Sequence, residues 1–174
     1  MIVGGCLCNG VRYEYDGEIE EISICHCSLC RKAQGSAYVA VSPVDASRFR
    51  IVHGQELLRE YRAVPDKARV FCANCGSPIY SARDDLPGIR RLRLGTVETP
   101  FACRNAYHIH VASQAPWEII ADGLPQYAGA RSDLPANGRP MPAESGIAEA
   151  GEHRSVLSGP SLPSSIDDGA ADVG

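Results

Sequence analysis

The cysteines constrain this chain more than any other feature of its sequence. Seven of the eight fall into three short groups that lie far apart along the chain. We call them the first pair (Cys6, Cys8), the triplet (Cys25, Cys27, Cys30) and the last pair (Cys72, Cys75). Cysteines at such short spacing are typical of zinc-binding turns, in which thiolates converge on one tetrahedral ion. We therefore expect zinc to join distant parts of this chain.

The triplet places three thiols within six residues, in the segment Cys25-His26-Cys27-Ser28-Leu29-Cys30. If Cys25 and Cys27 continue a strand, their side chains project to the same side, because side chains alternate along a strand. The two-residue gap from Cys27 to Cys30 then favours a turn that brings the third sulfur to the same metal. The triplet is therefore our candidate for the catalytic centre.

The seven thiols allow two partitions between metal sites. Four thiolates close a structural zinc site, whereas three leave one coordination position for water or substrate. In one partition the first and last pairs form a closed site and the triplet forms an open one. In the other, Cys27 and Cys30 join the last pair in a zinc ribbon. Gly76 follows the last pair and suits a turn with positive φ around a metal in both cases.

Composition limits the classes of protein to consider. The chain has 174 residues, of which 44% are hydrophobic and 22% charged, as expected for one soluble domain. Its net charge of −4 argues against a nucleic-acid or anionic-membrane partner. The first 30 residues do not read as a signal peptide, and we find no apolar run of about 20 residues. We expect a cytoplasmic protein, in which thiols stay reduced.

Alternating apolar and polar residues predict a mainly β protein. No segment keeps a period of 3.6 residues for more than about three turns, which favours a β-sandwich. The segments 48–52 and 57–62 suggest a hairpin around His53-Gly54. The other expected strands are 11–15, 18–24, 37–42, 69–71, 78–81, 91–94 and 106–111.

The end of the chain differs in composition from the rest. Proline, glycine and serine fill 17 of the 40 positions from 135 to 174. Such a segment buries too little apolar surface to offset the entropy of ordering it. We therefore divide the chain into a zinc-binding domain over residues 1–130 and a flexible tail over 131–174, with a short helix around 145–151 as the alternative for part of the tail.

The cysteine motifs and their surroundings resemble the glutathione-dependent formaldehyde-activating enzyme family, also called the GFA or centromere-protein-V-like domain. The resemblance covers roughly residues 4–127. The matching segments are Gly5-Cys6-Leu7-Cys8, Cys25-His26-Cys27-Ser28-Leu29-Cys30-Arg31-Lys32, Phe71-Cys72-Ala73-Asn74-Cys75-Gly76-Ser77-Pro78-Ile79-Tyr80 and Ala115-Pro116-Trp117.

The resemblance implies a zinc-binding β-sandwich of the β-tent type with two Zn²⁺ ions per chain. It assigns the first and last pairs (Cys6, Cys8, Cys72, Cys75) to a structural zinc. It assigns the triplet (Cys25, Cys27, Cys30) to a second, catalytic zinc whose fourth position admits the thiol of glutathione. The activity it implies is that of a carbon–sulfur lyase similar to S-(hydroxymethyl)glutathione synthase, which joins glutathione to formaldehyde.

The residues favour the same chemistry without the resemblance. A zinc ion held by three thiolates carries a formal charge of about −1 and prefers a soft fourth ligand. A thiol bound there becomes a thiolate, the form that attacks a carbonyl carbon. We therefore expect a small thiol, glutathione or a similar one, and a small aldehyde as substrates. The alternative is a noncatalytic zinc-binding module that binds a thiol or a protein partner, and a third possibility is a purely structural zinc fold.

Other polar residues receive weaker expectations. Arg31 and Lys32 follow the triplet, so they either contact a carboxylate of the thiol substrate or are solvated surface charges. His26 should point away from the metal, toward a supporting or surface position. His108 and His110 would share one strand face. We expect Trp117 in the core or a pocket wall, and Cys103 as a lone thiol.

Overall fold

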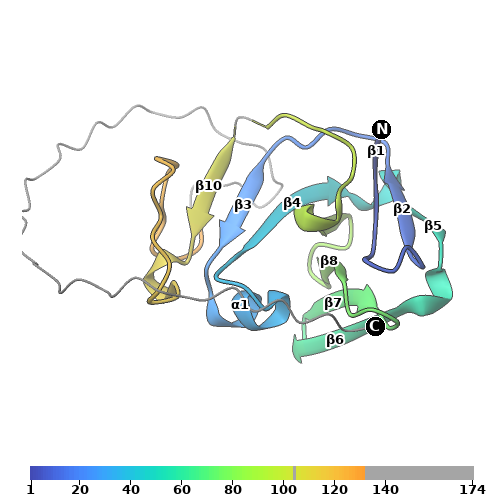
Figure 1. Cartoon of the computed structure of the whole chain (residues 1–174), viewed down its shortest axis with the longest axis horizontal. Coiled ribbons are helices and arrows are strands. Elements are labelled where there is room, and N and C mark those ends of the chain that lie inside the picture. Colours follow the sequence, from blue (N-terminus) through green and yellow to red (C-terminus); the bar gives the residue numbers. More distant parts are fainter. Residues whose placement is uncertain (104, 132–174) are drawn as a thin grey trace, which may run out of the picture. The chain divides into compact units, whose positions relative to one another are not determined.

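Short segments of alternating burial form ten strands in the part of the chain that the computed structural model describes, residues 1–103 and 105–131 (Figure 1). The strands are β1 (Ile2–Gly5), β2 (Arg12–Tyr15), β3 (Ile22–Cys25), β4 (Val39–Asp45), β5 (Phe49–His53), β6 (Leu58–Val64), β7 (Lys67–Cys72), β8 (Pro78–Arg83), β9 (Ile89–Arg93) and β10 (Ala106–Ile109). The helix α1 spans Ser28–Gln34, and short 3₁₀ turns span Ala46–Arg48, Gln55–Leu57, Leu94–Thr96 and Val111–Ser113.

The strands form two sheets, which confirms the prediction of a mainly β protein. One sheet has the order β1-β2-β5, and the other has the order β10-β3-β4-β9-β8-β7-β6. Neighbouring strands are antiparallel except β10, which runs parallel to β3. The predicted tail lies outside the described residues, apart from residue 131, and so does the alternative helix at 145–151.

Both sheets contribute to one main core. Phe49 of β5 packs its ring against Tyr13 at 5.3 Å and against Tyr80 of β8 at 5.5 Å, measured between ring centroids. Ile79 and Leu92 add fully buried aliphatic side chains to the same core. Each such side chain contributes about 1.5–3 kcal/mol of transfer free energy, so the core holds the two sheets face to face.

A smaller apolar cluster lies in the large sheet where β3 and β4 meet α1. It contains Val39 and Val41 of β4 together with Cys25 and Cys30. Figure 1 shows α1 beside the end of β3. Among the described residues, no helix is long and apolar enough to cross a bilayer.

The predicted hairpin of segments 48–52 and 57–62 is wrong. β5 pairs with β2 in the small sheet, whereas β6 pairs with β7 in the large sheet. Gly54 has a φ of 75° and opens the 3₁₀ turn between them. A Cβ atom at Gly54 would lie 1.8 Å from the carbonyl oxygen of Gly10, so only glycine fits there. The chain therefore crosses between the sheets at Gly54 instead of folding back on itself.

Candidate functional site

The first and last pairs of cysteines meet in one group, the four-thiol cluster (Cys6, Cys8, Cys72, Cys75). The four sulfur atoms lie within 4.8 Å of one another. The Sγ atoms of Cys6 and Cys8 are 3.4 Å apart, and those of Cys8 and Cys72 are 3.9 Å apart. Zinc–sulfur bonds of about 2.3 Å in a tetrahedron place sulfurs about 3.8 Å apart. The cluster therefore fits a closed four-thiolate zinc site.

Two matching turns bring these thiols together. The first turn follows β1 and the second follows β7, where Gly76 takes a φ of 75° and its N–H donates to the Cys72 carbonyl at 2.8 Å. The backbone N–H of Leu7 donates to the hydroxyl of Ser77 at 2.9 Å and ties one turn to the other. The positive φ expected at Gly76 is confirmed.

Hydrogen bonds and burial act in opposite directions on these thiols. Burial raises the pKa of the Cys6 thiol to about 11, whereas a hydrogen bond with Asn74 lowers the pKa of Cys8. Burial also opposes ionisation of Cys75, but hydrogen bonds with Ser77 lower its pKa to about 5. A bound cation favours thiolate at every position, so the cluster is suited to hold a metal.

The triplet forms a separate group, the three-thiol cluster (Cys25, Cys27, Cys30). Its sulfurs also lie within 4.8 Å of one another, and within the described residues no fourth cysteine, histidine or carboxylate ligand joins them. Cys25 and Cys30 are buried and Cys27 is half-buried. Three protein ligands leave one position of a tetrahedral ion free, so this arrangement fits an open metal site. The geometry thus agrees with the four-plus-three partition and not with the zinc ribbon.

A short helix, and not only the predicted turn from Cys27 to Cys30, positions the third thiol. Cys27 is the N-cap of α1, and its Sγ accepts a hydrogen bond from the backbone N–H of Cys30 at 3.4 Å. Gly35 ends the helix with a φ of 69°, and its N–H donates to the carbonyl of Arg31. Because the helix is only seven residues long, its period could not be recognised in the sequence.

The thiols of the triplet are unequal. A hydrogen bond with Cys25 lowers the pKa of Cys30, and the positive charges of Lys67 and Arg93 lower it further. The same hydrogen bond and burial raise the pKa of Cys25. Cys30 therefore ionises more readily than Cys25, and the large sheet supplies cations close to it.

His26 is fully buried and begins a line of polar groups that ends at exposed Asp122. Its Nε2 lies 2.8 Å from Nδ1 of His108, and Nε2 of His108 lies 2.9 Å from a carboxylate oxygen of Asp122. If the carboxylate accepts from His108, then His108 accepts from His26, and Nδ1 of His26 is left without a proton. That atom is buried without a hydrogen-bond partner. His26 thus supports the triplet from within the protein and is not a surface residue.

Two expectations about aromatic and imidazole side chains are wrong. His108 and His110 do not share a strand face, because β10 ends at Ile109 and His110 has a φ of 56°. Trp117 is 72% exposed and belongs to neither core nor pocket. Cys103 lies outside both thiol clusters, as expected.

Arg31 and Lys32 both lie on α1. The Nε of Arg31 donates to the carbonyl of His26 at 3.2 Å, so this guanidinium is partly used in holding the segment that carries the triplet. Lys32 is exposed. Their predicted contact with a substrate carboxylate stays a prediction.

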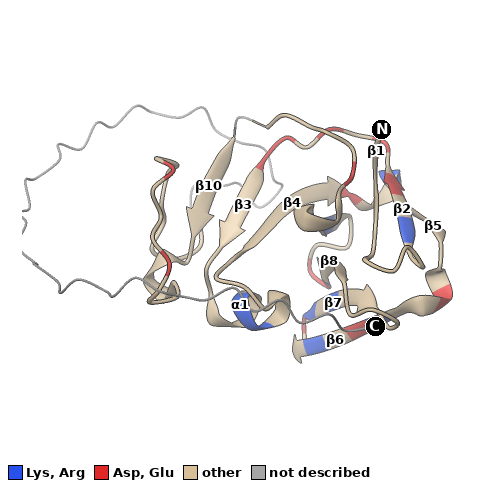
Figure 2. Ribbon diagram, viewed as in Figure 1, with Lys and Arg blue, Asp and Glu red and all other residues tan. Residues whose placement is uncertain are grey.

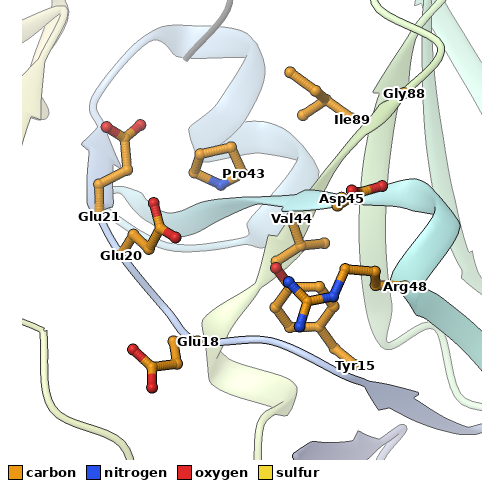
Figure 3. A pocket seen from close by; sticks show the side chains of 10 residues that line it. All are labelled: Tyr15, Glu18, Glu20, Glu21, Pro43, Val44, Asp45, Arg48, Gly88 and Ile89. Carbon is orange, nitrogen blue, oxygen red and sulfur yellow. The ribbon is translucent and has the colours of Figure 1, made fainter. Parts of the chain in front are cut away.

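A hollow of about 330 Å³ lies beside β4, away from the chemistry of the thiols. Figure 3 shows Glu18, Glu20 and Glu21 on one side of it and Arg48 next to the ring of Tyr15 on the other. The arginine carbon lies 5.9 Å from that ring's centroid. None of the lining residues is a cysteine. The hollow is acidic, so it does not suit an anionic thiol.

Sequence reasoning missed the buried cations of the large sheet. Arg69 and Arg93 are among its buried residues, and Lys67 is half-buried. The signal was present as alternation in Lys67-Ala68-Arg69 and Arg91-Leu92-Arg93, but alternation alone does not tell which face of a strand is covered.

The part of this chain that matches a known protein family contains both thiol clusters. Residues 1–113 match the family described as glutathione-dependent formaldehyde-activating enzyme. An uncharacterized lyase of Schizosaccharomyces pombe is 32% identical over 79 residues, which cover 45% of this chain and 56% of that protein. A Halomonas elongata protein whose name places it among the glutathione-dependent formaldehyde-activating enzymes is 29% identical over 86 residues, covering 46% and 55%.

The chain thus spans somewhat more than half the length of these relatives. The crystal structure of a Rhodobacter sphaeroides protein superposes with a TM-score of 0.48 and 25% identity, covering 56% of this chain and 89% of that one. The family match covers 113 of 174 residues and contains all seven clustered cysteines. The chain therefore belongs to the glutathione-dependent formaldehyde-activating enzyme family.

Proposed function

We propose that this chain is a zinc-dependent carbon–sulfur lyase, similar to S-(hydroxymethyl)glutathione synthase. It activates glutathione or a similar thiol for addition to formaldehyde or another small aldehyde. The observation that carries the proposal is the three-thiol cluster, whose sulfurs lie within 4.8 Å of one another without a fourth ligand among the described residues. The names of the family and of its relatives support the substrate classes.

The two clusters take different roles in this proposal. The four-thiol cluster holds a structural Zn²⁺ and ties the turn after β1 to the turn after β7. The three-thiol cluster holds a second Zn²⁺ through Cys25, Cys27 and Cys30. Zinc bound there would supply a Lewis acid that keeps a substrate thiol deprotonated yet electron-rich.

The reaction needs no oxidant or reductant. The thiolate sulfur attacks the carbonyl carbon of the aldehyde, a carbon–sulfur bond forms and the π bond of the carbonyl opens. The oxygen takes up the proton that the thiol released, so formaldehyde gives a hydroxymethyl thioether. The protein's part is to hold the sulfur in place, and the capped start of α1 sets the position of Cys27 and Cys30 for this purpose.

Cobalt substitution tests the assignment of the open site. We expect two metal ions per chain and a change in the cobalt–thiolate absorption when glutathione is added. Cys27→Ser should abolish this change while the circular dichroism spectrum stays native. Cys103→Ser is the matched control, because this cysteine lies outside both clusters, and it should behave like the native protein. A glutathione-dependent change that persists in Cys27→Ser would contradict the proposal.

A rate measurement separates the enzyme from a noncatalytic module. Thiols add to formaldehyde without a catalyst, so the exchange of labelled formaldehyde into the adduct must be compared with a protein-free control. We expect faster exchange with the native protein and a return to the spontaneous rate with Cys27→Ser. Thiol binding without acceleration would support the alternative, a zinc-binding module that binds a thiol or a protein partner.

A further inference from the structure

Lys67 of β7 and Arg93 of β9 lie near the triplet, and both also lie near a third cation, Arg69 of β7. Arg69 is only 8% exposed and Arg93 only 4%. Nevertheless, Nε and Nη1 of Arg69 and Nε of Arg93 are buried without a hydrogen-bond partner. None of the three forms an ion pair within the described residues. Buried charges without partners are costly, so these groups call for a ligand.

The strand register places these cations on one face of the sheet. Arg69 lies opposite Ser81 of β8, and Ser81 lies opposite Arg91 of β9. Side chains two residues apart on a strand share a face, so Lys67 lies on the same face as Arg69, and Arg93 on the same face as Arg91. Figure 2 shows the Lys and Arg positions of β7 in blue.

The same face carries the first thiol of the triplet. Arg93 lies opposite Val41 of β4, and Val41 lies opposite Ser23 of β3. Cys25 is two residues beyond Ser23 on β3 and therefore shares this face. The cations and the thiols thus belong to one surface of the sheet.

Electrostatic coupling agrees with this placement. Burial lowers the pKa of Lys67, and the nearby Cys30 thiol raises it in part. Burial lowers the pKa of Arg93 as well, again with an opposite contribution from Cys30. Nη1 of Arg91 is also buried without a hydrogen-bond partner, and burial lowers the pKa of Arg91, but the charges of Asp85 and Glu21 act in the opposite direction. No carboxylate is among the main contributors to the pKa of Lys67 or Arg93.

The negative charge of a metal site at the triplet would not by itself account for the three cations. A zinc ion with three thiolates carries a formal charge of about −1, whereas three cations face it. Moreover, no sulfur of the triplet accepts a hydrogen bond from Arg69, whose Nε and Nη1 lack any partner. The arrangement holds more positive charge and more donors than the thiolates can use.

We propose that Lys67, Arg69 and Arg93 form an anion site that receives a carboxylate of the thiol substrate. This inference rests on the proposed thiol activation at Cys25, Cys27 and Cys30. A guanidinium presents paired donors that match the two oxygens of a carboxylate. The substrates are therefore thiols that carry a carboxylate, as glutathione does, and not neutral thiols such as 2-mercaptoethanol.

Calorimetric titration tests the anion site apart from catalysis. The probes are glutathione, S-methylglutathione, which keeps the carboxylates but has no free thiol, and 2-mercaptoethanol. Arg69→Met and Arg93→Met should weaken the binding of glutathione and S-methylglutathione by about tenfold to hundredfold, because each removes charge-assisted hydrogen bonds. Binding of 2-mercaptoethanol should stay unchanged.

Arg90→Met is the matched control. Arg90 lies on β9 like Arg93 but on the opposite face, with its guanidinium carbon 5.6 Å from the ring centroid of Tyr80. This variant should bind all three probes like the native protein. Equal affinity of native protein and Arg69→Met for glutathione would overturn the inference, and so would equal weakening by Arg90→Met.

Thermal unfolding shows whether the cations are only structural. Methionine has a similar volume and no unpartnered charge, so Arg69→Met should leave the midpoint of the unliganded protein unchanged or raise it. The rise in midpoint that glutathione causes in the native protein should be lost. A midpoint that falls by several degrees without ligand would mean that the cations hold the fold, and would overturn the inference.

The same experiments distinguish failure of the inference from failure of the proposed function. If no thiol changes the cobalt spectrum but S-methylglutathione still binds in a manner that depends on Arg69, the anion site stands and thiol activation fails. If glutathione and 2-mercaptoethanol change the spectrum equally and Arg69→Met has no effect, thiol activation stands and the anion site fails.

Discussion

The two thiol clusters use the same ligand atom in different surroundings. Cys6 and Cys72 of the four-thiol cluster are part of the main core, whereas Cys25 and Cys30 of the three-thiol cluster belong to a small apolar cluster with Val39 and Val41. A metal ion held by all four thiols of the first cluster would have no position left for a substrate. A metal ion held by the three thiols of the second cluster would have one.

The groups that surround the two clusters also differ, in their charge. The backbone N–H of Val11 donates to the sulfur of Cys6 at 3.2 Å, and the Cys75 sulfur lies 3.3 Å from the Ser77 hydroxyl oxygen. The three-thiol cluster instead faces Lys67 and Arg93. Neutral hydrogen-bonding groups surround the thiols of the four-thiol cluster, whereas cations without an ion-pair partner favour the binding of a further anion. The comparison teaches that the clusters differ in the number of thiols and in the charge around them, and on these two properties we propose that one is structural and the other catalytic.

The largest effect should come from breaking one cluster at a time. A structural zinc contributes about 10–16 kcal/mol of binding free energy, which exceeds the net stability of most domains. Cys72→Ser should therefore leave an unfolded chain. Cys27→Ser should lose one zinc and remain folded, as measured by metal analysis and circular dichroism. A folded Cys72→Ser protein would remove the distinction between the clusters.

Truncating one buried side chain in the main core and one in the small apolar cluster should have the next largest effect, on the free energy of unfolding. Ile79 is fully buried in the main core, and its replacement by alanine should lower the free energy of unfolding by about 2–5 kcal/mol. Val41→Ala in the small cluster should cost less, about 1–2 kcal/mol, because fewer methylene groups are lost. Urea unfolding measures both. Equal costs would show that the small cluster is as important for stability as the main core.

The histidine pair beside the three-thiol cluster should give a smaller effect. His108→Leu removes the partner of buried His26 and should cost about 1–3 kcal/mol, because a buried polar nitrogen is left unsatisfied. The double variant His26→Phe/His108→Leu should recover part of that loss. A double-mutant cycle of urea unfolding measures the coupling, and additive losses would argue against a functional hydrogen bond between the two rings.

The smallest effect should appear in the acid range. Hydrogen bonds from the Leu124 N–H and with His108 hold the pKa of Asp122 below its ordinary value. This carboxylate therefore contributes stability above its unfolded pKa of about 4, and the contribution is lost as the pH falls through the folded pKa. Asp122→Asn should lose less stability than the native protein over that range. Asp66→Asn, on the β6–β7 turn, is the control, and thermal midpoints at successive pH values provide the comparison.

Much of the site was predictable because its signal is local. Cysteine spacing and the residues between the cysteines predicted the three cysteine groups and the family, since the residues of each group are close in sequence. Alternation predicted most strands for the same reason. Gly76 is the clearest example of a local signal. Its position after the last pair predicted a turn with positive φ, which glycine tolerates, and its φ is 75°.

The errors arose where the determining contact is distant in sequence. The hairpin failed because Gly54 must pass close to Gly10, which no pattern near residue 54 records. Trp117 is a large aromatic residue of the kind expected in a core, and yet it is exposed to solvent. The sequence predicted a turn from Cys27 to Cys30 and not the helix α1, because seven residues are too few to show a helical period.

The sequence by itself determined the three groups of cysteines, the strand periods and the family of this protein, since each depends on residues that are neighbours along the chain. Only the tertiary structure decided how the thiols divide into four and three, that His26 meets His108, and that Arg69 and Arg93 are buried on the face of the triplet. These features depend on strand order and register, which bring together residues tens of positions apart. The alternation of apolar and polar residues along a strand does not tell which face is buried. Packing against the rest of the protein decides that.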